Sequence, residues 1–100
     1  MAGALRGALE VAGPEICAGW AQCAAAPEVP VELLVFAGAE VVARVLANGY
    51  RADLRAAGLG SGCCGFMAAI PAGVRGRISV RRALDGAEVG CGGEEVVRVA

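Results

Sequence analysis

The chain has 100 residues, of which 57% are hydrophobic, and its nine arginines and ten acidic residues leave a net charge of −1. This length suits one domain with a self-sufficient core, so residues 1–100 are expected to form a single domain. The balanced charge argues against a nucleic-acid partner. Charged residues interrupt every apolar run before the roughly 18 uncharged residues of a membrane span, which argues against such a span.

The first apolar run is interrupted by Glu10 before the hydrophobic region of a secretory signal could form, so we expect a cytoplasmic location. A module cut from a longer polypeptide fits the same N-terminal sequence. The chain contains no histidine. This removes Ser-His-Asp and Cys-His nucleophile pairs, histidine general bases and mixed Cys/His zinc sites, so we expect neither an enzyme nor a cofactor.

Short segments with two-residue alternation, separated by turn residues, predict β-strands in the first half of the chain. The predicted strands are 5–12, 15–21, 31–38 and 40–48. Gly38 and Ala39 join the last two as a hairpin. In the fourth segment we expect the face opposite Arg44 to be buried. That face carries Val41, Ala43, Val45 and Ala47.

After Gly49 the sequence changes to good helix formers, which predict a short helix near 51–57. Asp53 lies near its start, where the helix dipole favours an anion. Gly58 lies where a left-handed residue would end the helix, and in such a closure Leu54 packs against Leu59.

Strands resume over 64–70, 77–84 and 94–100. About seven short strands and one short helix, mostly joined by tight turns, predict an all-β fold of immunoglobulin-like antiparallel β-sandwich type. A small β-barrel is the alternative. Arg77 and Arg81 share one face of their strand, which we interpret as a solvated sheet surface rather than an anion site.

The stretch GLGSGCCGF, residues 58–66, matches the G-x-G-x-x-G pattern of dinucleotide-binding loops at Gly60, Gly62 and Gly65. That fingerprint needs a strand before the glycines and a helix after them. Here a predicted helix precedes the glycines and a strand follows, so the negative end of the helix dipole faces the loop. We therefore interpret the stretch as a turn.

The five cysteines contain no C-x-x-C pair, so neither a zinc knuckle nor a thioredoxin-like centre is indicated. We interpret them mainly as free structural thiols, with one disulfide as a second option. A thiolate metal site is the third option. Cys23, Cys63 and Cys91 lie in or near predicted turns and could converge with Cys64 at one end of a sandwich.

The aromatic residues are expected to divide between core and surface. We place Trp20 and Phe66 in the core between the sheets, with an exposed sugar-stacking Trp20 as the alternative. Tyr50 is expected to be partly exposed. Arg51 and Asp53, at i and i+2, do not face each other on a helix, so each is expected to anchor the helix through backbone hydrogen bonds or a local ion pair. Tyr50, Arg51 and Asp53 form the predicted ligand or partner surface.

The segment GWAQCAAAPEVPVELLVFAGAEVVARVLANGYRADLRAAGLGSGCCGFMAAIP, residues 19–71, resembles an uncharacterised bacterial β-sandwich module associated with glycosyltransferase-containing and other cell-surface-polysaccharide proteins. The YRADLRAAG and GF elements are specific to that module as a pair. The matching positions are Gly19, Trp20, Ala21, Tyr50, Arg51, Asp53, Leu54, Gly58, Gly65 and Phe66. Two acidic residues and a histidine of the module are replaced here by Cys23, Ser61 and Cys64. The resemblance implies an accessory role at most.

We therefore expect a non-catalytic accessory or interaction module that contacts a carbohydrate or a protein partner near Tyr50, Arg51 and the helix. The alternative is a metal-binding or redox-responsive small domain at the cysteine-bearing loops. Homo-oligomerisation through an apolar sheet face or an unprotected edge strand is compatible with the first interpretation.

Overall fold

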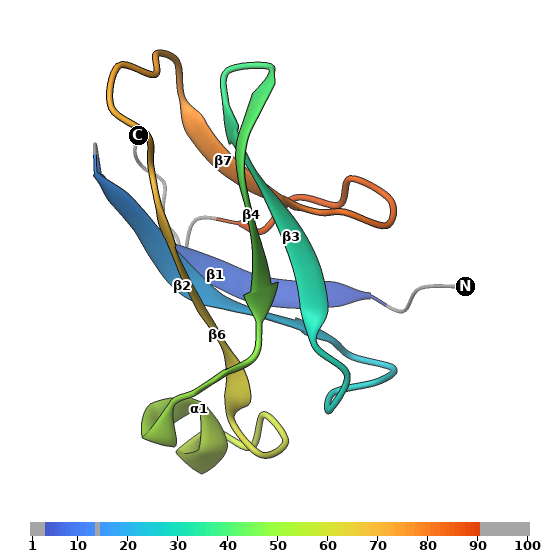
Figure 1. Ribbon diagram of the computed structural model, residues 1–100. Coiled ribbons are helices and arrows are strands. Elements are labelled where there is room, and N and C mark those ends of the chain that lie inside the picture. Colours follow the sequence, from blue (N-terminus) through green and yellow to red (C-terminus); the bar gives the residue numbers. More distant parts are fainter. Residues whose placement is uncertain (1–3, 14, 91–100) are drawn as a thin grey trace.

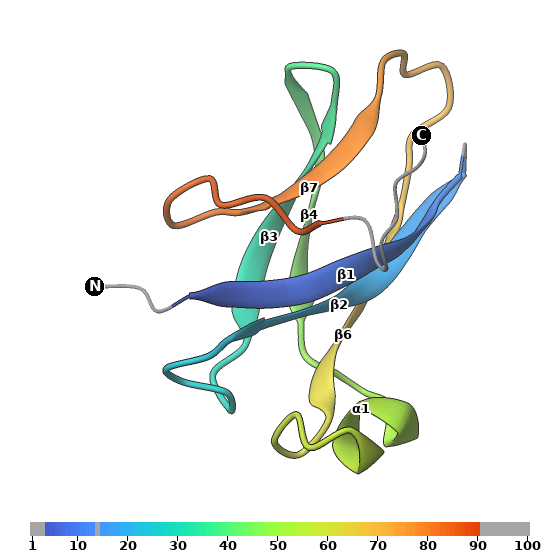
Figure 2. The same ribbon diagram turned by 180° about the vertical axis from the view of Figure 1, so that it is seen from behind.

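Seven β-strands and one short helix form two antiparallel sheets in the computed structural model, which describes residues 4–13 and 15–90 (Figure 1). The elements are β1 (Leu5–Ala12), β2 (Ile16–Cys23), β3 (Val31–Ala37), β4 (Glu40–Ala47), β5 (Gly49–Tyr50), α1 (Ala52–Ala56), β6 (Cys63–Ala69) and β7 (Ile78–Arg82). The four-stranded sheet has the order β1-β2-β6-β5, and the three-stranded sheet has the order β4-β3-β7. Seen from behind, β1 and β2 lie in front of β3 and β4, so the sheets form two layers (Figure 2).

Six of the predicted strands are confirmed to within two residues at each end. The other predicted strand, 94–100, lies outside the described residues. The remaining observed strand is β5, which has two residues and pairs with β6. It forms because the chain leaves the three-stranded sheet after β4 and crosses to the four-stranded sheet. Two residues are too few for an alternation pattern to reveal.

The core lies between the sheets and is built from their inward faces. In β3 alternate residues from Val31 to Ala37 are buried, as the two-residue period of a strand requires. Phe66 of β6 is buried with them, so its predicted core position is confirmed. The core cluster contains Leu9, Cys17, Ala21, Val31, Leu33, Val35, Ala47, Phe66, Ala68, Ile70, Val80 and Val89. Burial of these mainly aliphatic side chains is the principal stabilising contribution.

Trp20 does not belong to this core, so its predicted position between the sheets is wrong. In β2 the inward residues include Cys17 and Ala21, and Trp20 points the other way. On the outer face of the four-stranded sheet it lies opposite Ala8 of β1 and Gly65 of β6, where it is partly buried. Pairing with two neighbouring strands sets the orientation of β2 and sends its small residues inward.

A β-bulge in β4 changes the predicted inward face of that strand. Val35 lies opposite Ala43 and Phe36 lies opposite Val41, so Val42 is an extra residue in β4. The bulge leaves Val41 exposed and lets Val42 pack against the core, which corrects the predicted burial of Val41. The other three residues of the predicted face keep their inward orientation.

Candidate functional site

The short helix α1 follows β5 and positions the predicted surface residues. It begins after Arg51 and is closed by Gly58, which has a left-handed backbone with a φ of 84°. The Gly58 N–H donates to the Arg55 carbonyl and the Leu59 N–H donates to the Leu54 carbonyl, which is the predicted Schellman closure. The helix has five residues, and no helix in the described part of the chain is long and apolar enough to cross a membrane.

Arg51 is held by two carboxylates from different parts of the chain. Its Nη1 donates to Glu10 Oε1 at 2.6 Å and its Nη2 donates to Glu10 Oε2 at 3.3 Å. Its Nε donates to Asp53 Oδ1 at 3.1 Å and its Nη2 donates to Asp53 Oδ2 at 2.8 Å. Glu10 lies at a bulge in β1, so these forked pairs tie the start of α1 to the far edge of the four-stranded sheet.

The direct pair between Arg51 and Asp53 fits the expected anchoring by a local ion pair. The expectation that the two side chains do not face each other is wrong, because Arg51 precedes the helix with an extended backbone (φ −137°, ψ 125°). Hydrogen bonds first to Glu10 and then to Asp53 raise the pKa of Arg51, and the bond from Arg51 lowers the pKa of Asp53. One cation and two carboxylates give this ion-pair cluster a net charge of −1.

Gly65 makes room for the Arg51 side chain. A Cβ atom at Gly65 would lie 2.9 Å from Arg51 Cδ and 3.1 Å from the Gly49 carbonyl oxygen. Arg51 follows β5 and Glu10 lies in β1, and β6 and β2 lie between these two strands. The Arg51 side chain must therefore pass over β6 to reach Glu10. The last glycine of the G-x-G-x-x-G match therefore has a packing role in this structure.

A cavity of about 320 Å³, which we call the Tyr50 cavity, opens beside the ion-pair cluster. It is lined by Val45, Leu46, Asn48, Gly49, Tyr50, Arg51, Gly65, Phe66 and Met67. Tyr50 is 57% exposed, as expected, and Met67 is 65% exposed, so both side chains are open to a ligand. Tyr50 and Arg51 therefore line the same cavity. Asp53 does not line it but is hydrogen-bonded to Arg51. Sequence reasoning missed Glu10 and Met67, because neither lies near the others along the chain.

The stretch GLGSGCCGF contains the turn that links α1 to β6, as predicted. Ser61 donates to the Glu28 carboxylate from its backbone N–H at 2.9 Å and from its hydroxyl at 2.7 Å. The buried Gln22 side chain donates to the Leu59 carbonyl at 3.1 Å. The bonds from Ser61 lower the pKa of Glu28. A backbone donor that a phosphate would need is therefore already bound to an internal carboxylate.

The four described cysteines lie in two strands of one sheet, Cys17 and Cys23 in β2 and Cys63 and Cys64 in β6. Among the described residues, no three His, Cys, Asp or Glu side chains are grouped to hold a metal ion, and Cys91 lies outside those residues. Among the described residues, Cys17, Cys63 and Cys64 are free thiols. Cys63 and Cys64, as neighbours in β6, point to opposite faces of the sheet. Burial raises the pKa of Cys17 and of Cys64, which disfavours the reactive thiolate of both.

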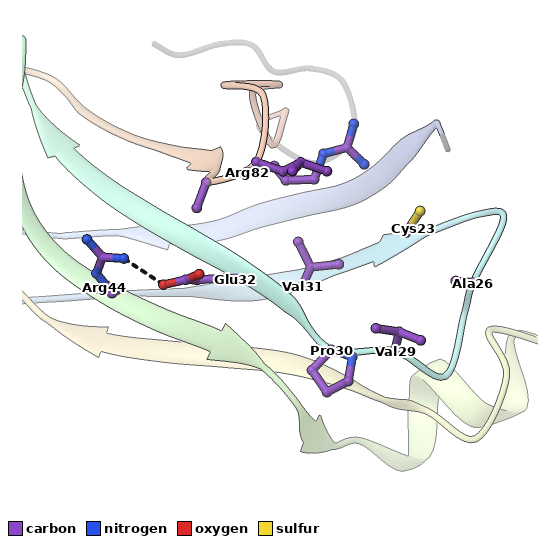
Figure 3. Close-up of a pocket in the computed structure, with 10 residues that line it drawn as sticks. Cys23, Ala26, Val29, Pro30, Val31, Glu32, Arg44 and Arg82 are labelled. Carbon is purple, nitrogen blue, oxygen red and sulfur yellow. Dashed lines mark hydrogen bonds and ion pairs between the residues drawn. The ribbon is translucent and has the colours of Figure 1, made fainter. Parts of the chain in front are cut away.

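A second cavity, of about 450 Å³, lies where the β2–β3 connection meets the end of β7 (Figure 3). It is lined by Cys23, Ala26, Val29, Pro30, Val31, Glu32, Arg44, Arg82, Ala83 and Leu84. The Arg44–Glu32 ion pair, with 2.7 Å between Nη1 and Oε2, lies at one end, and Cys23 lies at the other (Figure 3). Most of the wall is apolar, so this second cavity offers surface for an apolar group. Three separate chain segments form it, which no local sequence pattern could reveal.

The Arg82–Asp85 pair beside the second cavity predicts an acid dependence of stability. Arg82 donates to Asp85 from Nε at 2.9 Å and from Nη2 at 2.7 Å, and the Ala87 N–H donates to Asp85 at 3.1 Å. These bonds lower the pKa of Asp85 from 3.8 to about 2. The pair therefore contributes stability that is present above about pH 4 and is lost as the pH falls through about 2.

We would record thermal melts from about pH 5 to about pH 2. Over this range the melting temperature of the Asp85→Asn variant should fall by less than that of the unchanged chain. The variant has no carboxyl group to protonate at this position. Glu40→Gln, at an exposed residue, is the control and should lose as much as the unchanged chain. Equal acid dependence in all three proteins would contradict the assignment to Asp85.

Comparisons of the chain with models of known protein families, with curated proteins and with solved structures found no match.

Proposed function

We propose that the chain is a non-catalytic module that binds a carbohydrate at the Tyr50 cavity. The observation that carries this proposal is the position of Tyr50, whose exposed side chain lines a cavity together with Arg51, a polar side chain that two carboxylates hold in place. A sugar ring presents an apolar C–H face and a rim of hydroxyl groups. An aromatic ring with hydrogen-bonding groups next to it is complementary to both.

The polar groups beside Tyr50 are in place before a ligand binds. The side chains of Glu10 and Asp53 are held by Arg51, yet they stay 40% and 66% exposed, which leaves acceptor lone pairs for sugar hydroxyls. The amide of Asn48 adds a donor and an acceptor at the cavity wall. Groups that are already ordered lose less conformational entropy on binding. The net negative charge of the ion-pair cluster favours a neutral sugar over an acidic one.

The two strand orders support an immunoglobulin-like form of the sandwich. In that fold one sheet has the order A-B-E-D, and the other sheet contains strands C, F and, in variable-type domains, C′. If β1, β2, β6 and β5 are A, B, E and D, then β3, β7 and β4 take the places of C, F and C′. The resemblance of residues 19–71 to a polysaccharide-associated module supports a carbohydrate ligand. A thiol-based site has less support, because Cys63 and Cys64 point apart.

The Tyr50→Ala variant is expected to bind sugar at least tenfold more weakly than the unchanged chain, with an unchanged melting temperature. The ring lies outside the core, so its loss removes ligand contact and little packing. The full chain would first be tested on an array of neutral and uronic-acid-containing oligosaccharides. Titration calorimetry with the strongest array ligand then gives the affinities of both proteins.

Two further variants separate ligand contact from scaffold effects. Arg51→Ala releases both carboxylates, so it should weaken binding and also lower the melting temperature. Leu84→Ala truncates an exposed side chain at the second cavity and should change neither. An array without any bound sugar, or an affinity that Tyr50→Ala leaves unchanged, would overturn the proposal. A protein ligand that depends on Tyr50 would instead favour the protein-partner alternative.

A further inference from the structure

The outer face of the three-stranded sheet carries Arg81, an arginine that has no charged partner among the described residues. Residues paired across neighbouring strands point to the same side of a sheet. One row across this face is formed by Arg44, Leu34, Arg81 and Glu88. Arg44 pairs with Glu32 at 2.7 Å and Arg77 pairs with Glu88 at 3.4 Å. Arg81 makes no ion pair with any of the described residues.

Local packing holds the Arg81 guanidinium in place. Its Cζ atom lies 5.3 Å from the centroid of the Phe36 ring, which is a cation–π contact. Its Nε is the one buried side-chain nitrogen or oxygen of the described residues that lacks a hydrogen-bond partner. The interpretation of Arg81 as a solvated residue is therefore wrong at Nε, although the residue as a whole is only partly buried. A fixed and partly desolvated cation of this kind is well suited to a carboxylate.

Apolar side chains of β3 and β4 lie on one side of this cation, toward the β4 edge of the sheet. Val41 is 47% exposed and Leu46 is 48% exposed, both on the outer face of β4. Leu34 and Phe36 of β3, which are partly buried, lie on the same face and extend the apolar surface toward Arg81. A small anion would neutralise Arg81 but leave this surface in water. A protein segment with apolar side chains beside its carboxylate would cover both.

We propose that this face of β3, β4 and β7 is a docking surface for an acidic, apolar segment of a partner protein. A Glu or Asp carboxylate of the segment would bind the terminal nitrogens of Arg81, and its aliphatic side chains would cover Val41 and Leu46. Arg81 is then the anchor of the interface. Glu32 and Glu88 lie on the same face, and their charges make a nucleic-acid backbone a poor fit.

The experiment is a titration of the isotopically labelled full chain with an end-capped eight-residue peptide of alternating Glu and Val, followed by backbone NMR. A matched peptide with Gln at every Glu position is the first control. We expect chemical-shift changes confined to β3, β4 and β7, and at least tenfold weaker binding of the Gln peptide. Sodium acetate at the same carboxylate concentration should not produce these changes.

The Arg81→Gln variant should also weaken binding of the Glu peptide at least tenfold. Arg75→Gln, which removes the same charge at an exposed position outside the strands, should leave it unchanged. If Arg81→Gln does not fold, the comparison of the Glu and Gln peptides decides by itself. Equal binding of the two peptides, equal effects of the two variants, or an acetate response like that of the peptide would overturn the proposal. Chemical shifts on this face that change with protein concentration in the absence of peptide would mean that a second copy of the chain occupies the face. That result would also overturn the proposal.

Discussion

Replacing Leu33 by Ala is expected to lower the free energy of unfolding by about 3 kcal/mol. Leu33 is 0% exposed, and it is the largest of the fully buried side chains among the described residues. It lies in β3, the central strand of the three-stranded sheet, where both neighbouring strands fix its backbone. The walls of the resulting void therefore cannot close. In a chain of this length the melting temperature should fall by more than about 10 °C, as measured by circular dichroism.

Leu84→Ala provides the matched control, because it makes the same truncation at a side chain that is 73% exposed. It should change the free energy of unfolding by less than about 0.5 kcal/mol. Similar losses in the two variants would contradict the placement of Leu33 in a close-packed core.

Replacing Gly19 by Ala is expected to destabilise the fold by roughly 3 kcal/mol or more, because it separates β1 from β2. A Cβ atom at Gly19 would collide with the backbone carbonyl of Ala8 and lie 3.1 Å from Leu9 Cα. Gly7 faces β2 in the same way, with a Cβ that would lie 2.9 Å from Ala21 Cα. Backbone atoms cannot move aside as the end of a flexible side chain can. Urea unfolding followed by Trp20 fluorescence would measure the loss.

Gly13→Ala is the matched control for this substitution. A Cβ there meets only the Ile16 carbonyl oxygen, at 3.7 Å, which is an ordinary contact. The variant should be neutral or more stable by up to about 1 kcal/mol, because alanine restricts the unfolded chain. A Gly19→Ala protein as stable as Gly13→Ala would show that β1 and β2 are not in close backbone contact.

The secondary structure could be predicted well wherever local chemistry determines it. The hairpin of β3 and β4 follows from two alternating segments around Gly38, and the end of α1 follows from Gly58 and the spacing of Leu54 and Leu59. The glycine stretch could be assigned to a turn because the order of helix and strand around it is wrong for a dinucleotide site. Each of these inferences depends on one continuous stretch of the chain.

The candidate site could be predicted only in part. Tyr50, Arg51 and Asp53 are neighbours in the chain, so one motif indicates all three. Glu10 is 41 residues from Arg51 and enters the site only because β1 and β5 belong to one sheet. Met67 enters because β6 runs beside β5. A single sequence contains no signal for such contacts, since they depend on strand order.

The sequence by itself determined the strand segments, the short helix and its closure, and the absence of histidine chemistry, because these depend on residue type and short-range periodicity. Only the tertiary structure decided which face of each strand is buried, since pairing and bulges set that orientation. It therefore placed Trp20 outside the core, turned Val41 outward, and left Arg81 without a charged partner among the described residues. A one-residue shift reverses every side chain of a strand, and that shift is a property of the assembled sheets.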